Sequence, residues 1–347
     1  MAQIRLSAQS VAGYLLQRGL LTAGNGRRIR VLDLSRRNHN LAIEVDGRPT
    51  WFIKQMQHFT PEVVASLKNE ANCYQTAWAS EDLSRVRTLM PRCADFDAMN
   101  SILILEYVSG VNAAEAHLRL EPFDVRVAEL LGRTVGSLHR QTPPLLRSSM
   151  VQEFHGNLPW VLQHIAEAYP SSRARYVSRF MEHEGAAASF AAIRAEWKAD
   201  TVIHGDTRLE NFILCPSPDS KSGFDVKLVD WELADIGDAL WDCAGVMQHY
   251  FVQWVSEHAP TPVVWAKLEA ALMRFWRAYR AEVCDNGRTD RGRFRNLMLF
   301  TGARLVQAGY EHLANSKADT PYIENLARLM LTETDGMLRG FDSGEEA

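Results

Sequence analysis

Residues 202–214 read VIHGDTRLENFIL, and this stretch combines short apolar runs with a dense group of polar side chains. The apolar pair at its start, Val202 and Ile203, predicts a β-strand that leads into His204. Asp206 follows directly in a glycine-containing turn, and Asn211 lies five residues further along. A second apolar run begins at Phe212 and predicts another strand. An acid and an amide are therefore expected on the turn that joins two strands.

Residues 228–232 read LVDWE and show the same pattern of a short apolar strand followed by an acid. Leu228 and Val229 lead directly into Asp230. Transfer of a phosphoryl group to a hydroxyl requires one acid that receives a proton and oxygen ligands that hold Mg²⁺. We interpret Asp206 as the catalytic base or hydroxyl-orienting group, and Asn211 and Asp230 as the Mg²⁺ ligands. The alternative for each is an ordinary turn residue, such as an aspartate that caps a helix.

The composition is typical of a globular protein, with 46% apolar and 23% charged residues in a chain of 347. A formal net charge of −4 gives no reason to expect a nucleic acid or an anionic membrane as a partner. The N-terminus lacks the apolar core of a signal peptide, and no apolar run approaches membrane-spanning length. The five cysteines lie far apart, which favours reduced thiols and a cytoplasmic location.

Residue patterns in the first third of the chain predict a small antiparallel sheet with two helices. Alternating apolar residues indicate strands, and helical spacing with capping residues indicates helices. The expected helices are 7–21 and 61–79, and the expected strands are 28–34, 41–46, 51–54 and 101–108.

From about residue 111 onward the pattern changes to helices, interrupted by the strands around Asp206 and Asp230. The expected helices are 124–140, 158–169, 173–197, 236–257, 262–284, 291–314 and 320–340. The sequence therefore predicts an α+β protein of two lobes, with a β-rich N-lobe over 1–106 and a helical C-lobe over 107–347.

Four motifs resemble the aminoglycoside phosphotransferase and choline kinase branch of the protein-kinase-like fold. HGDTRLEN resembles the family's HGDxxxxN loop, and LVDWELADIGDALWD resembles its metal-binding segment. WFIK resembles the strand that carries the nucleotide lysine, and LEY resembles the hinge. The motifs occur in the family's order between about 28 and 245, whereas a P-loop motif GxxxxGK[ST] is absent. The resemblance implies a bilobal kinase fold, a kinase or phosphotransferase activity on an alcohol group, and ATP and Mg²⁺ as cofactors.

The resemblance also implies roles for residues in the N-lobe. Lys54 is expected to neutralise the α- and β-phosphates, and Glu70 to pair with Lys54, with Glu62 as the rival partner. Main-chain groups from Glu106 to Val108 are expected to contact adenine.

The turn from Ser35 to Asn40 is expected to lie over the phosphates, with Ser35, Asn38 and Asn40 as binding residues. It lacks the glycines of protein kinases, as is usual in this branch. The remaining polar residues of the turn either contact phosphate or are solvated: Arg36, Arg37 and His39.

Arg208 occupies the place where protein kinases carry a lysine two residues after the catalytic aspartate. A forked guanidinium there would stabilise charge on the γ-phosphate. The alternative is a structural ion pair with Glu210 or Glu232. His204 is expected to be structural, and Asp242 to anchor the backbone of the catalytic loop.

The acceptor is the least determined feature. Enzymes that phosphorylate aminoglycosides offer acidic clefts to polycations, whereas residues 271–304 are rich in arginine, which disfavours a role in antibiotic resistance. We expect a small-molecule hydroxyl acceptor. One alternative is a Ser/Thr kinase for ribosomally made precursor peptides, of the lanthipeptide or thioamitide type, which acts with a partner lyase. Another is a nucleotide-binding pseudokinase, which the presence of Lys54, Asp206, Asn211 and Asp230 opposes.

Overall fold

The computed structural model divides into two compact units, each assembled from separate stretches of the chain. Unit 1 contains Met1–Asn112, Pro143–Phe154 and Asn211–Ala234, and unit 2 contains Ala113–Thr142, His155–Glu210 and Asp235–Ala347. No helix among the described residues is long and apolar enough to cross a membrane. The structure describes residues 4–22, 28–35, 38–119, 121–163, 172–220, 222–257, 261–283, 291–315, 317 and 319–336.

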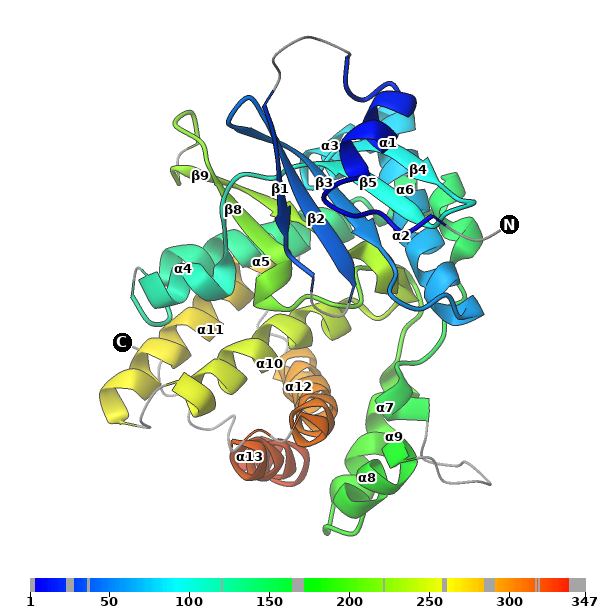
Figure 1. Ribbon diagram of the computed structural model, residues 1–347. Helices are drawn as coiled ribbons and strands as arrows, with labels where there is room; N and C mark the ends of the chain where they lie inside the picture. Colours follow the sequence, from blue (N-terminus) through cyan, green and yellow to red (C-terminus); the bar gives the residue numbers. More distant parts are fainter. Residues whose placement is uncertain are drawn as a thin grey trace. The chain divides into compact units, whose positions relative to one another are not determined.

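Unit 1 is built on a five-stranded antiparallel sheet with the strand order β1-β2-β3-β5-β4 (Figure 1). The turn between β2 and β3 contains Asp46 and Gly47 with φ angles of 54° and 79°, the left-handed conformations that tight hairpins require. The strands are β1 (Ile29–Asp33), β2 (His39–Val45), β3 (Arg48–Gln55), β4 (Cys93–Asp97) and β5 (Ile102–Glu106).

One face of this sheet is covered by the N-terminal segment and helix α1 (Val11–Gln17). Leu6, Val11 and Leu15 pack on apolar side chains of β2, β3 and β5. The helix is shorter than the predicted range 7–21, because residues 7–10 form a turn before it and Gly19 takes a φ of 71° after it.

Helix α2 (Pro61–Ala79) forms where the sequence predicts it. The side chain of Thr60 accepts a hydrogen bond from the amide of Val63, and Pro61 occupies the first turn, where no amide hydrogen is needed. The other elements of unit 1 are η1 (Glu81–Leu83), α3 (Ser84–Thr88), η2 (Ser149–Glu153), η5 (Trp231–Leu233) and a three-stranded sheet of β6 (Val111–Asn112), β8 (Phe212–Pro216) and β9 (Phe224–Leu228).

Unit 2 is mainly helical, and its one described pair of strands is β7 (Thr201–Ile203) with β10 (Asp235–Gly237). Together with the sheet of unit 1, this confirms the predicted combination of an antiparallel sheet with a helical part. The helices are α4 (Ala113–Arg119), α5 (Val125–Arg140), α7 (Trp160–Gln163), α8 (Ser172–Met181), α9 (Ala186–Glu196), α10 (Ala239–Glu257), α11 (Pro262–Glu282), α12 (Arg291–Ala314) and α13 (Thr320–Thr332). Helices α6 (Thr142–Leu146) and η4 (Leu209–Asn211) cross the division between the units.

Several predicted boundaries are wrong, for local reasons. The predicted helix 173–197 is two helices, because Gly185 adopts a left-handed φ of 81° between α8 and α9. The predicted helix 236–257 begins only at Ala239, since residues 235–237 pair with β7. Strand β4 was not predicted, and the part of the expected helix 158–169 beyond residue 163 lies outside the described residues.

The close packing of α5 on α11 predicts a stability effect at Gly132. A Cβ atom at this position would overlap the backbone oxygen of Phe275. We expect Gly132→Ala to lower the free energy of unfolding by about 1–3 kcal/mol in urea denaturation. Gly13→Ala in α1 is the matched control, because nothing lies within 4 Å of its new methyl group. That control is expected to gain about 0.5–1 kcal/mol, and equal effects of the two substitutions would contradict the close-packing explanation.

Candidate functional site

Lys54 is the buried centre of a charge cluster in unit 1. Successive side chains of β3 point to opposite faces of the sheet, so Lys54 lies on the face opposite to Ile53 and α1. Lys54 is 4% exposed, and its Nζ donates hydrogen bonds to Glu70 at 2.7 Å, to Glu232 at 2.8 Å and to Asp230. The structure therefore pairs Lys54 with Glu70, and not with Glu62, which is exposed in the first turn of α2.

Three carboxylates surround this one ammonium group. Burial would lower the pKa of Lys54, but attraction to Glu70, Asp230 and Glu232 outweighs burial and holds that pKa well above its ordinary value. Ligand atoms of the three acids all lie within 4.8 Å of one another, so this group could also hold a cation. Hard oxygen ligands of this kind suit Mg²⁺.

Asp230 and Asn211 are brought together by the β8–β9 hairpin. Phe212 pairs with Leu228 in the register of this hairpin, and the amide of Val229 donates to the carbonyl of Asn211 at 3.0 Å. Both candidate metal ligands therefore lie at the same end of the hairpin. Asp230 itself has left-handed backbone angles, φ 68° and ψ 58°, a strained state that recurs at functional sites.

Helix α2 holds the segment around Asp230 through two further side chains. The Tyr74 hydroxyl accepts a hydrogen bond from the amide of Asp230 at 3.2 Å, and Asn69 donates to the carbonyls of Glu232 and Ala234 at 3.3 and 2.9 Å. Sequence analysis missed the role of Tyr74 and the contact of Glu232 with Lys54. The sequence did contain one indication of the role of Tyr74. It lies four residues after Glu70, so both side chains lie on the same face of the helix.

The loop that carries Asp206 lies in unit 2 and is anchored on Asp242, as expected. The two carboxylate oxygens of Asp242 accept hydrogen bonds from the amides of His204 and Gly205 at 2.7 and 2.9 Å. His139 Nε2 lies 3.1 Å from the same carboxylate. Burial would raise the pKa of Asp242, but these partners outweigh it and hold that pKa below its ordinary value. His204 is fully buried, and its Nδ1 accepts from the amide of Asp206 at 3.3 Å, so it supports the loop.

Asp206 is flanked by two arginines. Arg208 Nε donates to its carboxylate at 2.9 Å, so among the described residues of unit 2 Arg208 pairs with Asp206 rather than with Glu210. Burial would raise the pKa of Asp206, but Arg208 and then Arg304 outweigh it and hold that pKa below its ordinary value. Asp206 is therefore a carboxylate at neutral pH.

Arg304 was predicted only as a member of an arginine-rich stretch, yet it supports the loop from α12. Its guanidinium donates to the carbonyl of Gly205 at 3.1 Å and lies 4.5 Å from the ring centre of Trp241. Gly245 provides the space, because a Cβ there would overlap Arg304. Other arginines of this stretch also have partners inside unit 2, since Arg274 pairs with Glu129 and Arg295 with Asp335. The arginine count is therefore a poor measure of free positive charge.

The predicted phosphate turn is described only in part. Ser35 accepts a hydrogen bond from the amide of Asn40 at 3.1 Å, and Asn38 is half-buried just before β2. Arg36 and Arg37 lie outside the described residues.

The predicted hinge follows β5, which ends at Glu106. The amide of Glu106 donates to the carbonyl of Arg92 at 2.9 Å, and Val108 lies two residues further along, half-buried in a segment without regular structure.

Comparison with known proteins identifies the architecture. The model of the Phosphotransferase enzyme family matches residues 28–294, which is most of the chain. No curated protein sequence matches this chain.

Solved structures with low sequence identity share the fold. The choline kinase of Cryptosporidium parvum Iowa II is 13% identical with a TM-score of 0.62, and the match covers 96% of this chain and 98% of that one. The macrolide 2′-phosphotransferase of Brachybacterium faecium is 16% identical with a TM-score of 0.54, over 93% and 98% of the two chains. An amicoumacin kinase bound to AMP-PNP and Ca²⁺ is 11% identical with a TM-score of 0.57, over 92% of each chain. These matches confirm the expected protein-kinase-like fold.

The anchoring of the loop predicts a stability effect at Asp242. An asparagine would place an amide NH₂ against one of the two backbone donors, so a buried donor would lose its acceptor. We expect Asp242→Asn to lower the free energy of unfolding by about 2–3 kcal/mol in urea denaturation. Asp219→Asn in an exposed turn is the control and should stay within about 0.5 kcal/mol of the wild type. A wild-type stability for Asp242→Asn would show that the carboxylate is not needed to hold the loop.

Proposed function

This chain belongs to the Phosphotransferase enzyme family and is a phosphotransferase, and on this premise we propose that it transfers the γ-phosphate of ATP to a hydroxyl group of a small molecule in the presence of Mg²⁺. The observation that carries the proposal is the pairing of Lys54 with Glu70 beside Asp230. A lysine held by a helix glutamate next to a metal-binding aspartate is the arrangement that kinases use for nucleotide phosphates.

The nucleotide is proposed to bind to unit 1. Lys54 would neutralise the α- and β-phosphates, while Ser35, Asn38 and Asn40 would contact phosphate from the β1–β2 turn. Main-chain groups from Glu106 to Val108 would bind adenine.

The metal is proposed to bind through Asp230 and Asn211, with phosphate oxygens and water as the remaining ligands. The close grouping of acidic oxygens around Asp230 and the position of Asn211 at the same end of the hairpin fit a hard divalent cation. When bound, Mg²⁺ would neutralise charge on the transferred phosphoryl group.

Asp206 is proposed to orient the acceptor hydroxyl and to receive its proton late in the transfer. Its lowered pKa keeps the carboxylate ionised, and a weak base suffices for this role because phosphoryl transfer has a loose transition state and needs little early deprotonation. Arg208 is proposed to contribute positive charge beside the reacting groups, where a planar guanidinium can bind phosphate oxygens.

A small molecule is the favoured acceptor class. The similar structures are named as enzymes of choline, a macrolide and amicoumacin, all of them small molecules, and none of these names points to a peptide. The partner lyase of the peptide-kinase alternative has no support in these comparisons. The ion pairs of Arg274 and Arg295 also weaken the argument against cationic acceptors.

Mass spectrometry after incubation with Mg²⁺ and ATP tests the proposal directly. The acceptor panel should contain amino-alcohols, aminoglycosides, macrolides and Ser/Thr peptides, and a mass increase of one phosphate identifies the acceptor class. Binding of ATP without transfer to any acceptor would favour the pseudokinase. Absence of Mg²⁺-dependent ATP binding would overturn the proposed function.

Asp206→Asn tests the role of the carboxylate. We expect kcat to fall by about 10²–10⁴-fold, because the amide cannot accept the hydroxyl proton. Binding of ATP with Mg²⁺, measured by calorimetry, should remain close to that of the wild type. Asp200→Asn is the matched control, since Asp200 is exposed six residues earlier in the chain. Wild-type turnover by Asp206→Asn would remove Asp206 from the mechanism.

Arg208→Met tests the electrostatic pairing through the pH dependence of kcat/KM. The cation of Arg208 stabilises the ionised form of Asp206, so its removal raises the pKa of Asp206. The acid limb of the profile is therefore expected to move to higher pH. Arg85→Met on the exposed face of α3 should leave the profile unchanged. An acid limb that stays in place in Arg208→Met would show that Arg208 does not set the protonation of Asp206.

A further inference from the structure

The N-terminal segment of residues 4–10 is a feature that the family match does not include, because that match begins at residue 28. The segment lies on the face of the sheet opposite to Lys54, where Leu6 is 2% exposed and belongs to the core that α1 forms. The segment therefore packs on the back of the sheet whose other face carries Lys54.

Two polar side chains of the sheet, the half-buried His39 and the fully buried Gln55, hold this segment by its backbone. His39 Nε2 lies 2.8 Å from the carbonyl oxygen of Leu6, and this oxygen can only accept, so Nε2 carries the proton. Gln55 is fully buried, accepts from the amide of Leu6 at 3.1 Å and donates to the carbonyl of Ile4 at 2.6 Å. The backbone of the segment thus satisfies the buried amide group of Gln55.

These two side chains come from one rung of the sheet. His39 is the cross-strand partner of Gln55, and the next rung joins Asn40 to Lys54. Side chains of adjacent rungs point to opposite faces of the sheet. The N-terminal segment is therefore attached directly behind the rung that carries two of the proposed nucleotide-binding residues.

A chain of hydrogen bonds continues from His39 into the proposed phosphate turn. In the neutral imidazole with its proton on Nε2, the Nδ1 atom of His39 accepts from the Ser35 hydroxyl at 3.0 Å. The hydroxyl oxygen of Ser35 in turn accepts from the amide of Asn40 at 3.1 Å. The chain of contacts thus links the backbone of Leu6 to both described ends of the turn, Ser35 and Asn40.

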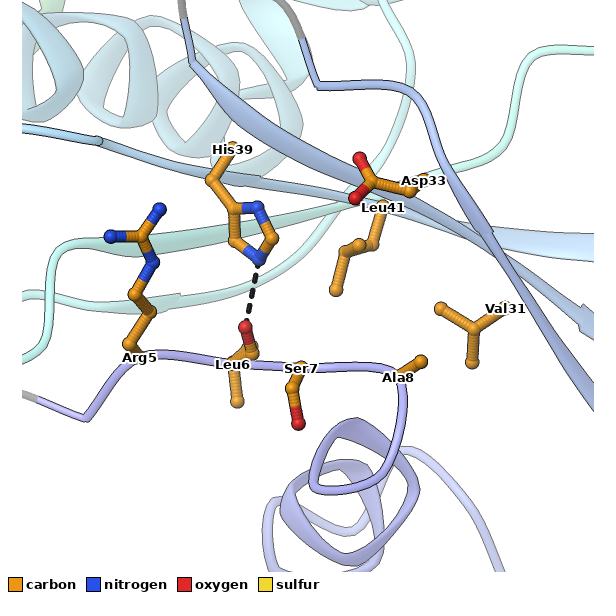
Figure 2. Close-up of a pocket in the computed structure, with 8 residues that line it drawn as sticks. All are labelled: Arg5, Leu6, Ser7, Ala8, Val31, Asp33, His39 and Leu41. Atoms are coloured by element: carbon orange, nitrogen blue, oxygen red, sulfur yellow. Dashed lines mark hydrogen bonds between the residues drawn. The ribbon is translucent and has the colours of Figure 1, made fainter.

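Figure 2 shows His39 of the sheet and Leu6 of the segment, joined by their hydrogen bond across the space between segment and sheet. A cavity of about 430 Å³ lies between residues 5–8 of the segment and strands β1 and β2. The segment is therefore not packed closely against β1 here, which makes the polar contacts of His39 and Gln55 important for its position.

From this arrangement we infer that the N-terminal segment is a strap that positions the proposed nucleotide site from behind, and that His39 is the positioning residue that connects the two. The inference rests on the proposed function, because it assumes that Ser35, Asn40 and Lys54 contact the nucleotide. A docked strap holds the β1–β2 turn and the Lys54 rung in the binding geometry before ATP arrives. Pre-ordering of this kind increases affinity by reducing the ordering that binding requires.

Two substitutions of His39 separate the links to the segment and to the turn. In His39→Asn the side-chain oxygen takes the place of Nδ1 and can still accept from Ser35, but nothing reaches Leu6. In His39→Gln the amide nitrogen takes the place of Nε2 and can still donate to Leu6, but Ser35 loses its acceptor. Because the relay needs both links, we expect each variant to weaken binding of ATP with Mg²⁺ by about 2–10-fold in calorimetry.

The His39→Asn variant is decisive, because it leaves the turn intact and removes only the connection to the strap. Wild-type affinity in His39→Asn would overturn the inference, even if His39→Gln binds weakly. His183→Asn, an exposed histidine in unit 2, is the matched control and should bind as the wild type does. Absence of ATP binding by the wild type would instead overturn the proposed function, and this inference with it.

Hydrogen–deuterium exchange supplies a second measurement, and its main comparison uses the wild-type protein alone. If docking of the strap favours ATP binding, ATP must favour docking of the strap by the same factor. Amide exchange over residues 4–10 of the wild-type protein is therefore expected to slow by about 2–10-fold when ATP and Mg²⁺ are added. In His39→Asn this slowing should disappear. Exchange that does not respond to ATP in the wild type would contradict a strap coupled to the site.

Discussion

The burial of the Lys54 ammonium group is the constraint on which the rest of unit 1 depends. A charge with 4% exposure is costly unless opposite charges and hydrogen bonds surround it. Glu70, Asp230 and Glu232 meet this requirement from two separate stretches of chain. Helix α2 and the segment after β9 must therefore lie beside β3, and the same attraction that stabilises this packing assembles the acidic oxygens of a metal site.

A buried carboxylate has the corresponding role in unit 2. Asp242 binds two consecutive backbone amides of the loop that carries Asp206, while Arg304 binds a carbonyl of that loop from another helix. The loop conformation is thus held by charged groups that do not themselves need to touch a substrate. Such pre-organised surroundings are what electrostatic catalysis requires, because the protein need not rearrange as charge develops. The strap behind β2 and β3 extends the same principle to the opposite face of the sheet.

Features that depend on neighbours in sequence were predictable. The strand that ends before His204 and the helix that begins at Pro61 follow from apolar periodicity and capping. The sixteen-residue separation of Lys54 and Glu70 suits a strand followed by a helix, and the structure pairs them. The ends of helices were predicted less well. Gly185 divides the predicted helix 173–197 into two, although its apolar spacing is continuous. The boundary between lobes near residue 106 stays a prediction, as do the roles of the site residues.

Sequence by itself determined the family, the strand-and-turn settings of Asp206 and Asp230, and the chemical types available for phosphoryl transfer. Only the tertiary structure decided which charges meet. Arg208 pairs with Asp206 rather than with Glu210, Arg274 with Glu129 and Arg295 with Asp335, and Arg304 is buried. The physical reason is that the energy of a charge pair depends on distance and burial, which residue spacing does not specify across separate elements. The contact of His39 with the N-terminal segment likewise joins residues that are far apart in the sequence, so only the tertiary structure reveals it.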